Sequence, residues 1–385
     1  MKVNQIYELV NTITSEVLGK SGVVLEDLSN IVDVGKELFD NTSVDNYVKT
    51  LVDKVAKMVF VSRPYSGSIP SIMMDSWEFG AVVQKVSAEL PEAVENKSWE
   101  LTNGTDYSPN VFYKPTVSNK FFNNKSTFEI DMSFTEMQVK GSFANANELN
   151  SFITMLYNAV ENSFTVKIDG LVMRTINNMI AETINGDKTS NIKAVNVLKL
   201  YNTETGKTVK AKDCLKDIDF LRYFSMKMGL YRDRLSKMST LFNLGAKDRF
   251  TPADRLHTVM LTDAKKSLDV YLQADIRHNE NTMYPPCETV PYWQGSGTDY
   301  GFNAISSINV KISGGASGIT VSKSGILAIM FDSEAVGISN LNRRVTTNYN
   351  PKGEFYNNFF KMEVGAFNDL NENFVVFFVE DSTTP

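Results

Sequence analysis

Hydrophobic residues recur every three or four positions across residues 147–186, and this spacing predicts one very long helix. The recurring positions are Leu149, Phe152, Ile153, Leu156, Val160, Phe164, Ile168, Leu171, Val172, Ile176, Met179, Ile180 and Ile184. Asn147 is a good N-cap, Glu148 places negative charge in the first turn, and Gly186 is a good stop. At 1.5 Å per residue this helix would be roughly 58 Å long, so we expect other elements to lie across it. Helix propensity falls between Thr165 and Gly170, where a kink is also compatible with the pattern.

Three shorter amphipathic helices precede it, at residues 3–18, 24–39 and 44–57, the last with Ser43 as its N-cap. Each carries one apolar stripe. Two interpretations remain open: the three helices form the core of a domain, or they form an arm whose stripes are buried by other subunits.

Between these helices and the long helix, residues 81–139 contain two segments that alternate between apolar and polar residues. One includes Val82, Val86 and Ala88, and the other runs over 128–135 and reads as a half-buried strand. The centre, 96–124, is polar but carries many aromatic residues: Trp99, Tyr107, Phe112, Tyr113, Phe121 and Phe122. The simplest fold is a long two-stranded ribbon. An isolated hairpin is marginal in water, so we expect the ribbon to lie on another surface, such as a neighbouring subunit.

The rest of the chain alternates helices and strands and then ends in strands. Residues 187–335 read as a compact α/β region with a strand at 195–200, a helix at 217–244, a strand at 257–261, a helix at 263–272, and short strands, 304–312 among them, within a Gly- and Ser-rich stretch. Four strands are then expected at 327–331, 343–349, 359–366 and 374–379, separated by turn residues at 350–353 and 367–371. The pattern as a whole predicts an α+β fold.

Composition narrows the class of protein. The 385 residues are 42% apolar and 11% aromatic, which is enough to bury sizeable cores. The net charge of −6 argues against a surface built to bind nucleic acid, because such surfaces carry a basic excess. Cys214 and Cys287 are too few and too far apart for a disulfide framework. No apolar run reaches the length of a membrane span, and residues 1–8 have no signal-peptide pattern.

No arrangement of residues suggests catalysis, a cofactor or a metal. Of the two histidines, His257 precedes an apolar strand and is expected to be structural, and His278 lies near Cys287 in a proline-rich loop. The acidic turn at 369–372 and Asp299 are expected to be solvated turn residues, because neither matches a calcium loop. Arg232 and Arg234 are expected on a solvated helix face.

Two stretches resemble a known family. Residues 325–379, GILAIMFDSEAVGISNLNRRVTTNYNPKGEFYNNFFKMEVGAFNDLNENFVVFFV, resemble the closing segment of the major capsid proteins of tailed bacteriophages, which have the Hong Kong 97 fold. Residues 44–61, VDNYVKTLVDKVAKMVFV, are similar to shell proteins of small short-tailed phages. The resemblance implies five parts: an N-terminal helical arm (1–60), a linker and extended E-loop ribbon (61–139), a P-domain with its spine helix (140–186), an A-domain (187–335) and returning P-domain strands (336–385).

The resemblance implies a structural protein, not an enzyme, that self-assembles in the bacterial cytoplasm into an icosahedral virion head around double-stranded DNA. Its expected partners are further copies in pentamers and hexamers, a separate scaffolding protein, a portal, and packaged DNA by non-specific proximity, but no membrane and no cofactor. We expect Trp99, Tyr107 and Phe112 to be covered by a neighbouring subunit. Arg343 and Arg344 are expected either at such an interface or in solvent. The alternatives are the shell of a cellular nanocompartment, an enzyme with an unrecognised site, and another phage structural protein such as a tail component.

Overall fold

The computed structural model describes residues 3–19, 24–25, 29–41, 44–61, 69–74, 83–88, 90–91, 93–96, 98–107, 109–110, 112–144, 146–273, 284–294, 300–312 and 318–381. The chain forms two compact units, each built from segments that are far apart in sequence. Unit 1 comprises Met1–Phe79, Lys125–Val172 and Ile338–Ala366, and unit 2 comprises Gly80–Asn124, Met173–Gly337 and Phe367–Pro385. None of the described helices is long and apolar enough to cross a lipid bilayer.

Unit 1 contains the three N-terminal helices, α1 (Val3–Leu18), α2 (Ile31–Asn41) and α3 (Val44–Val61). Their apolar stripes are buried, including Val10 and Ile13 of α1 and Val48 of α3. The second helix begins at Ile31 and not at residue 24. The reason is Asn30, whose side chain accepts a hydrogen bond from the Leu25 N–H while its carbonyl accepts the Val34 N–H that opens the helix.

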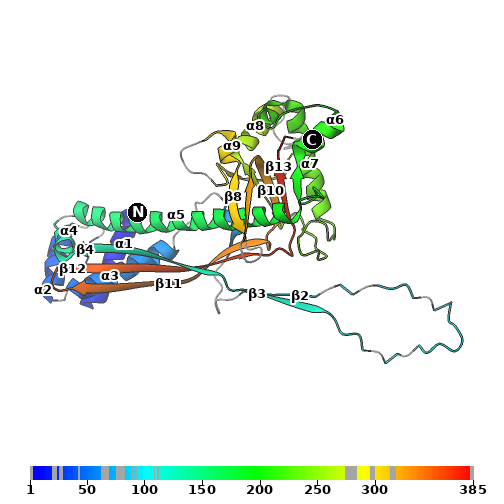
Figure 1. The fold of residues 1–385 in the computed structure, drawn as a ribbon. Coiled ribbons are helices and arrows are strands. Elements are labelled where there is room, and N and C mark those ends of the chain that lie inside the picture. Colours follow the sequence, from blue (N-terminus) through cyan, green and yellow to red (C-terminus); the bar gives the residue numbers. More distant parts are fainter. Residues whose placement is uncertain are drawn as a thin grey trace. The chain divides into compact units, whose positions relative to one another are not determined.

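A four-stranded sheet completes unit 1, in the order β1 (Met73–Met74), β11 (Val336–Asn350), β12 (Phe355–Asn368) and β4 (Lys125–Thr135). β4 and β12 are antiparallel from Phe355↔Thr135 to Gly365↔Lys125, and Figure 1 shows them side by side. The prediction that 128–135 forms one strand of the ribbon is therefore wrong, because this segment pairs with β12. Thr135 ends β4 and caps α4 (Glu136–Ser142) through a capping box with Gln138.

The long helix α5 runs over Ala146–Gly186, 41 residues, and confirms the element that the sequence predicts most strongly. It is continuous through 165–170. Val166 is exposed and the space around Gly170 is open, whereas Ile168 is buried in the apolar stripe. Of the thirteen apolar positions of the sequence pattern, all but Phe152 and Ile184 are buried.

Unit 2 is built on a five-stranded mixed sheet in the order β5 (Ala194–Asn196), β13 (Phe374–Phe378), β10 (Ile326–Asp332), β6 (Leu256–Leu261) and β7 (Glu288–Val290). Every residue of β10 and β13 is buried. Helices α6 (Val197–Thr205), α7 (Ile218–Leu235) and α8 (Thr262–Gln273) belong to this unit. Aromatic rings fill the space between α7 and β13, where the Tyr231 and Phe377 ring centroids are 5.1 Å apart.

Three sequence-based boundaries in unit 2 are wrong. The strand expected at 195–200 ends at Asn196, because the Asn196 side chain accepts the Lys199 N–H and starts α6. The helix expected at 217–244 ends at Leu235, whose carbonyl accepts the Thr251 N–H from a returning loop. The strand expected at 304–312 divides into α9 (Phe302–Ile305) and β8 (Ile308–Ile312), which pairs with β9 (Ile319–Lys323).

The ribbon of unit 2 consists of β2 (Val83–Ala88) and β3 (Val117–Phe122). They pair antiparallel from Val83↔Phe122 to Ala88↔Val117, and Figure 1 shows the long segment that connects them. The described residues of 90–116 form no helix or strand. β3 falls inside the stretch that the sequence predicts as a loop, so the ribbon exists but with a different second strand.

Candidate interaction surface

The segment between the two ribbon strands, residues 90–116, exposes large apolar side chains to an unusual degree. Trp99 is 72% exposed, Tyr107 56% and Phe112 84%. Leu90, Val94, Leu101 and Tyr113 of the same segment are also exposed. We call residues 90–116 the ribbon tip. Concentrated apolar exposure of this kind marks a surface that another molecule covers.

The two faces of the ribbon differ in a way that reverses the usual pattern of a sheet. In an antiparallel pair, residues that lie directly opposite each other share one face. One face carries Lys85 opposite Lys120 and Ser87 opposite Ser118, and these four polar side chains are half-buried. The other face is exposed and mainly apolar, with Val86, Ala88, Val117 and Phe121 among its residues. The ribbon thus turns its polar face toward the protein and its apolar face outward.

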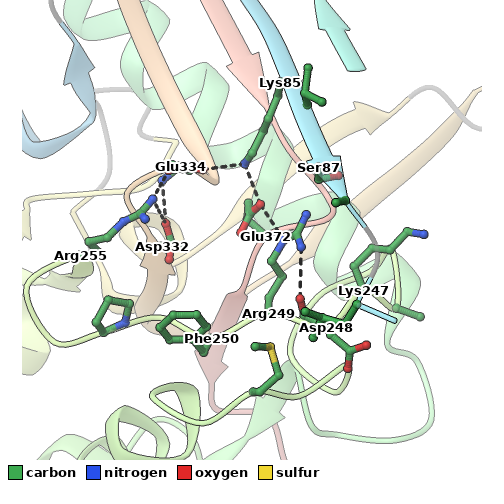
Figure 2. A pocket seen from close by; sticks show the side chains of 16 residues that line it. Lys85, Ser87, Lys247, Asp248, Arg249, Phe250, Arg255, Asp332, Glu334 and Glu372 are labelled. Carbon is green, nitrogen blue, oxygen red and sulfur yellow. Dashed lines mark hydrogen bonds and ion pairs between the residues drawn. The ribbon is translucent and has the colours of Figure 1, made fainter. Parts of the chain in front are cut away.

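The half-buried face is held by a group of ion pairs, which we call the clamp. Nζ of Lys85 lies 2.6 Å from Oε1 of Glu372, 3.0 Å from Oε2 of Glu334 and 3.1 Å from Oδ2 of Asp369. Nζ of Lys120 lies 2.9 Å from Oδ1 of Asp369. Figure 2 shows Lys85 directed toward Glu334 and Glu372. The phenyl rings of Phe122 and Phe367, 5.0 Å apart, add an apolar contact beside the clamp.

Two arginines of unit 2 also form ion pairs with carboxylates of the clamp. Nε of Arg249 donates to Oε1 of Glu372 at 2.9 Å, and Arg255 forms ion pairs with Glu334 and with Asp332. Glu334 and Glu372, two of the three carboxylates that meet Lys85, therefore each pair with an arginine as well (Figure 2). Asp332 and Glu372 are largely removed from water, and a basic side chain beside each of them offsets the cost of that burial.

The pKa values of the clamp shift in the direction that strengthens it. Burial acts to lower the pKa of Lys85, but the hydrogen bond and charge of Glu372 outweigh burial and raise it. Burial acts to raise the pKa of Asp369, but hydrogen bonds from Lys120 and the Asn371 N–H hold it below its ordinary value. Burial also acts to raise the pKa of Glu334, but the hydrogen bonds and positive charges of Lys85 and Arg255 together lower it. The shifts of Lys85, Asp369 and Glu334 thus all favour the charged form of the side chain.

The prediction that 369–372 is a solvated turn is wrong. The Asp369 side chain is 1% exposed and that of Glu372 is 7% exposed, because both turn inward to the ribbon lysines. The sequence offers no local signal for this, since Lys85 and Glu372 are separated by 287 positions.

Beside the clamp lies a cavity of about 620 Å³. Its walls include Lys85 and Val86 of β2, Arg249 and Phe250 of the loop that follows α7, and Glu334 and Glu372. Acidic and basic side chains in these walls pair with one another (Figure 2). Within the described part of the chain, no group of three or more His, Cys, Asp or Glu residues is placed to hold a metal ion.

The other residues singled out from the sequence are placed as follows. Arg344 lies 3.4 Å from Glu363 and remains 55% exposed, whereas the Arg343 side chain lies outside the described residues, as do His278 and Asp299. His257 packs at 5.7 Å from the Phe331 ring, which agrees with a structural role. Arg232 and Arg234 lie on an exposed face, as predicted.

Comparison with known proteins decides the family. A family model described as Phi29-like phage major capsid protein matches residues 10–378, nearly the whole chain. The chain belongs to this family. It is therefore a structural protein of a bacteriophage capsid, as the resemblance implies. No curated protein matches it in sequence.

Solved structures agree with the family at the level of the fold. A chain in the structure of the head fiber and inner core protein gp22 of native bacteriophage P68 is similar, with a TM-score of 0.53 and 8% identity over 82% of this chain and 85% of that chain. Identity this low shows a shared fold alone. Capsid structures of Staphylococcus phage Andhra and cyanophage P-SCSP1u match with TM-scores of 0.48 and 0.47 at 8% and 9% identity. They cover 83% and 84% of this chain and 86% and 91% of their own chains.

For this capsid protein, the α+β, Hong Kong 97-like fold is thus confirmed. The family gives no support to a nanocompartment shell, an enzyme or a tail component. Among the described residues of unit 2, exposed large apolar side chains cluster in the ribbon tip.

Proposed function

We propose that this capsid protein self-assembles into a closed icosahedral shell of pentamers and hexamers that encloses the double-stranded DNA genome. The observation that carries the proposal is the exposed ribbon tip, with Trp99, Tyr107 and Phe112 turned to solvent in the single subunit. Removing these apolar side chains from water would be favourable. In a shell, the surface available to cover them is that of a neighbouring copy of the same protein.

In this proposal the ribbon acts as the E-loop. It lies on a neighbouring subunit, which covers the aromatic side chains of the tip. Arg343 and Arg344 form a second, polar contact between subunits. Each contact is weak, but a closed shell repeats it in every subunit, and the summed contacts give a stable container.

The five-part division of the chain belongs to the same proposal: arm 1–60, linker and E-loop 61–139, P-domain 140–186, A-domain 187–335 and returning strands 336–385. A separate scaffolding protein and a portal act as partners during assembly in the host cytoplasm. Packaged DNA lies close to the shell without specific contacts, which suits the net charge of −6. The protein acts through its contacts and catalyses no reaction.

Negative-stain electron microscopy of the protein, expressed alone and together with its neighbouring genes, tests this proposal. We expect closed shells of uniform diameter in at least one of the two samples. Replacing Trp99 and Phe112 by serine should abolish them. Subunits that stay monomeric in both samples, or serine variants that assemble as well as the natural chain, would overturn the proposal.

A further inference from the structure

The two strands of the ribbon place like charges next to each other. Lys85 and Lys120 lie directly opposite each other on β2 and β3. Like charges in this position destabilise a pair of antiparallel strands. Here both ammonium groups reach the same carboxylate, that of Asp369, at 3.1 Å and 2.9 Å. The two lysines therefore favour the ribbon only when the turn that bears Asp369 lies against it.

The turn that holds Asp369 is itself firmly fixed. The Asp369 N–H donates to the Ala335 carbonyl at 2.8 Å, and the Asn371 N–H donates to the Asp369 side chain at 3.1 Å. The Leu370 carbonyl accepts the N–H groups of Leu244 and Gly245, both at 3.0 Å. A platform with this many backbone bonds moves little, so a ribbon bound to it keeps one direction.

Binding through the polar face determines what the ribbon presents on its other side. The exposed face carries Val86, Val117 and Phe121, which are 60%, 55% and 60% exposed. This face continues along the same two strands toward the ribbon tip. If the ribbon were rotated about its long axis, these apolar side chains would be buried and the lysines exposed. The clamp therefore determines which face of the ribbon is available to a partner.

We propose that Lys85 and Lys120 form a positioning clamp that fixes the direction of the ribbon, so that its apolar face docks on a second copy of this chain. The inference rests on the proposed function, because a shell surrounds each subunit with further copies. The apolar face of the strands is continuous with the ribbon tip, which we propose docks on a second copy. The same copy is therefore the partner that we expect for this face.

Hydrogen exchange of the full-length, unassembled subunit tests the clamp. In Lys85→Met, the amides of 83–88 and 117–122 should lose protection by about tenfold or more, because buried carboxylates lose a partner. The amides of 326–332 and 374–378 should keep theirs. Lys85→Arg should retain protection at both places. The matched control is Lys361→Met, which removes another cross-strand ion pair, 3.0 Å from Glu129, and should leave the ribbon unchanged.

Electron microscopy of the same variants tests the docking. Lys85→Met should reduce the fraction of subunits in shells, and Lys85→Arg should restore it. Phe121→Ser should reduce assembly while ribbon protection stays normal, because it alters only the outward face. If Lys85→Met fails to fold, Lys120→Met replaces it, since the Lys120 side chain is 40% exposed and so tolerates substitution better.

The outcomes separate this inference from the proposed function. Normal ribbon protection and normal shells in Lys85→Met, with shells still lost in the Trp99 and Phe112 serine variant, would overturn the clamp and leave the proposed function intact. Normal shells in Phe121→Ser would overturn the docking of the outward face. Normal shells in the Trp99 and Phe112 variant would overturn the proposed function itself.

Discussion

The five-stranded sheet and the ribbon of unit 2 differ in which side chains they bury. The central strands β10 and β13 bury every residue, and β10 pairs with a strand on each side. The ribbon has two strands, an exposed apolar face, and charged groups on its half-buried face. The sheet takes its stability from apolar burial within the subunit, whereas the ribbon is held by ion pairs at its base and, in our proposal, by surfaces outside the subunit.

This difference suggests a division of tasks within the capsid protein. We propose that the residues that stabilise the subunit and the residues that join subunits form separate sets. Substitutions in the sheet should therefore change the free energy of unfolding, whereas substitutions in the ribbon tip should change assembly.

The largest loss of stability is expected in the sheet. Phe377 is fully buried, with its ring centroid 6.2 Å from that of Phe224 and 5.1 Å from that of Tyr231. Phe377→Ala should lower the free energy of unfolding by about 3–5 kcal/mol, through lost burial and the cavity left behind. Urea denaturation of the unassembled subunit measures this. The matched control, Phe121→Ala in the ribbon, should change it by less than about 0.5 kcal/mol. If both variants lowered the free energy of unfolding equally, the sheet and the ribbon would not differ in their contribution to the stability of the subunit.

An intermediate effect is expected when acid neutralises the clamp. The charged groups that face one another there are Lys85, Lys120, Arg249, Arg255, Asp332, Glu334, Asp369 and Glu372. The pKa values of Asp369 and Glu334 are lowered in the folded state. Their stabilisation is therefore complete above the ordinary carboxyl pKa of about 4 and is lost as pH falls through the lowered values. The raised pKa of Lys85 makes its contribution complete below the ordinary lysine pKa and lost only in strong alkali.

Hydrogen exchange at 83–88 and 117–122, corrected for the intrinsic effect of pH, measures this acid release. We expect protection to be constant near neutral pH and to fall in strong acid, before the protection of 374–378 falls. Asp369→Asn is the control, because its ribbon should already be less protected at neutral pH and should change less with acid. Ribbon and sheet that lose protection together at every pH would contradict the clamp.

The sequence predicts elements whose signal lies within one segment. The long helix is correct within one residue at its start, because its apolar period extends over 41 residues. Strand β6 and helix α8 are also found where the pattern places them. The helix α7 is predicted too long because the boundary depends on a tertiary bond, from the Thr251 N–H to the Leu235 carbonyl, that leaves no local pattern.

The ribbon shows why the site is harder to predict than the fold. Trp99, Tyr107 and Phe112 stand out from the sequence because aromatic residues are unusual in a polar segment. Strand β3 does not, because its half-buried face carries polar residues and its apolar face is exposed. The clamp joins β2 to the turn before β13, and no periodicity relates residues so far apart in the chain.

A small effect is expected at the exposed ion pair between Arg344 and Glu363. The two groups are 3.4 Å apart and Arg344 is 55% exposed, so Arg344→Gln should lower the free energy of unfolding by only about 0.2–1 kcal/mol. Urea denaturation checks this. A loss of assembly far beyond that of Glu363→Gln, which breaks the same pair, would support the contact between subunits predicted for Arg344. Equal effects of the two variants would limit Arg344 to its own subunit.

The measurement that tests the central claim most directly compares stability and assembly in one variant, Trp99→Ser combined with Phe112→Ser. The free energy of unfolding of the unassembled subunit should stay within about 0.5 kcal/mol of the natural chain, because both side chains are already exposed. Electron microscopy of the same preparation should show no closed shells. Shells in normal number, or a subunit destabilised as strongly as Phe377→Ala, would contradict the claim that the ribbon tip exists to join one subunit to the next.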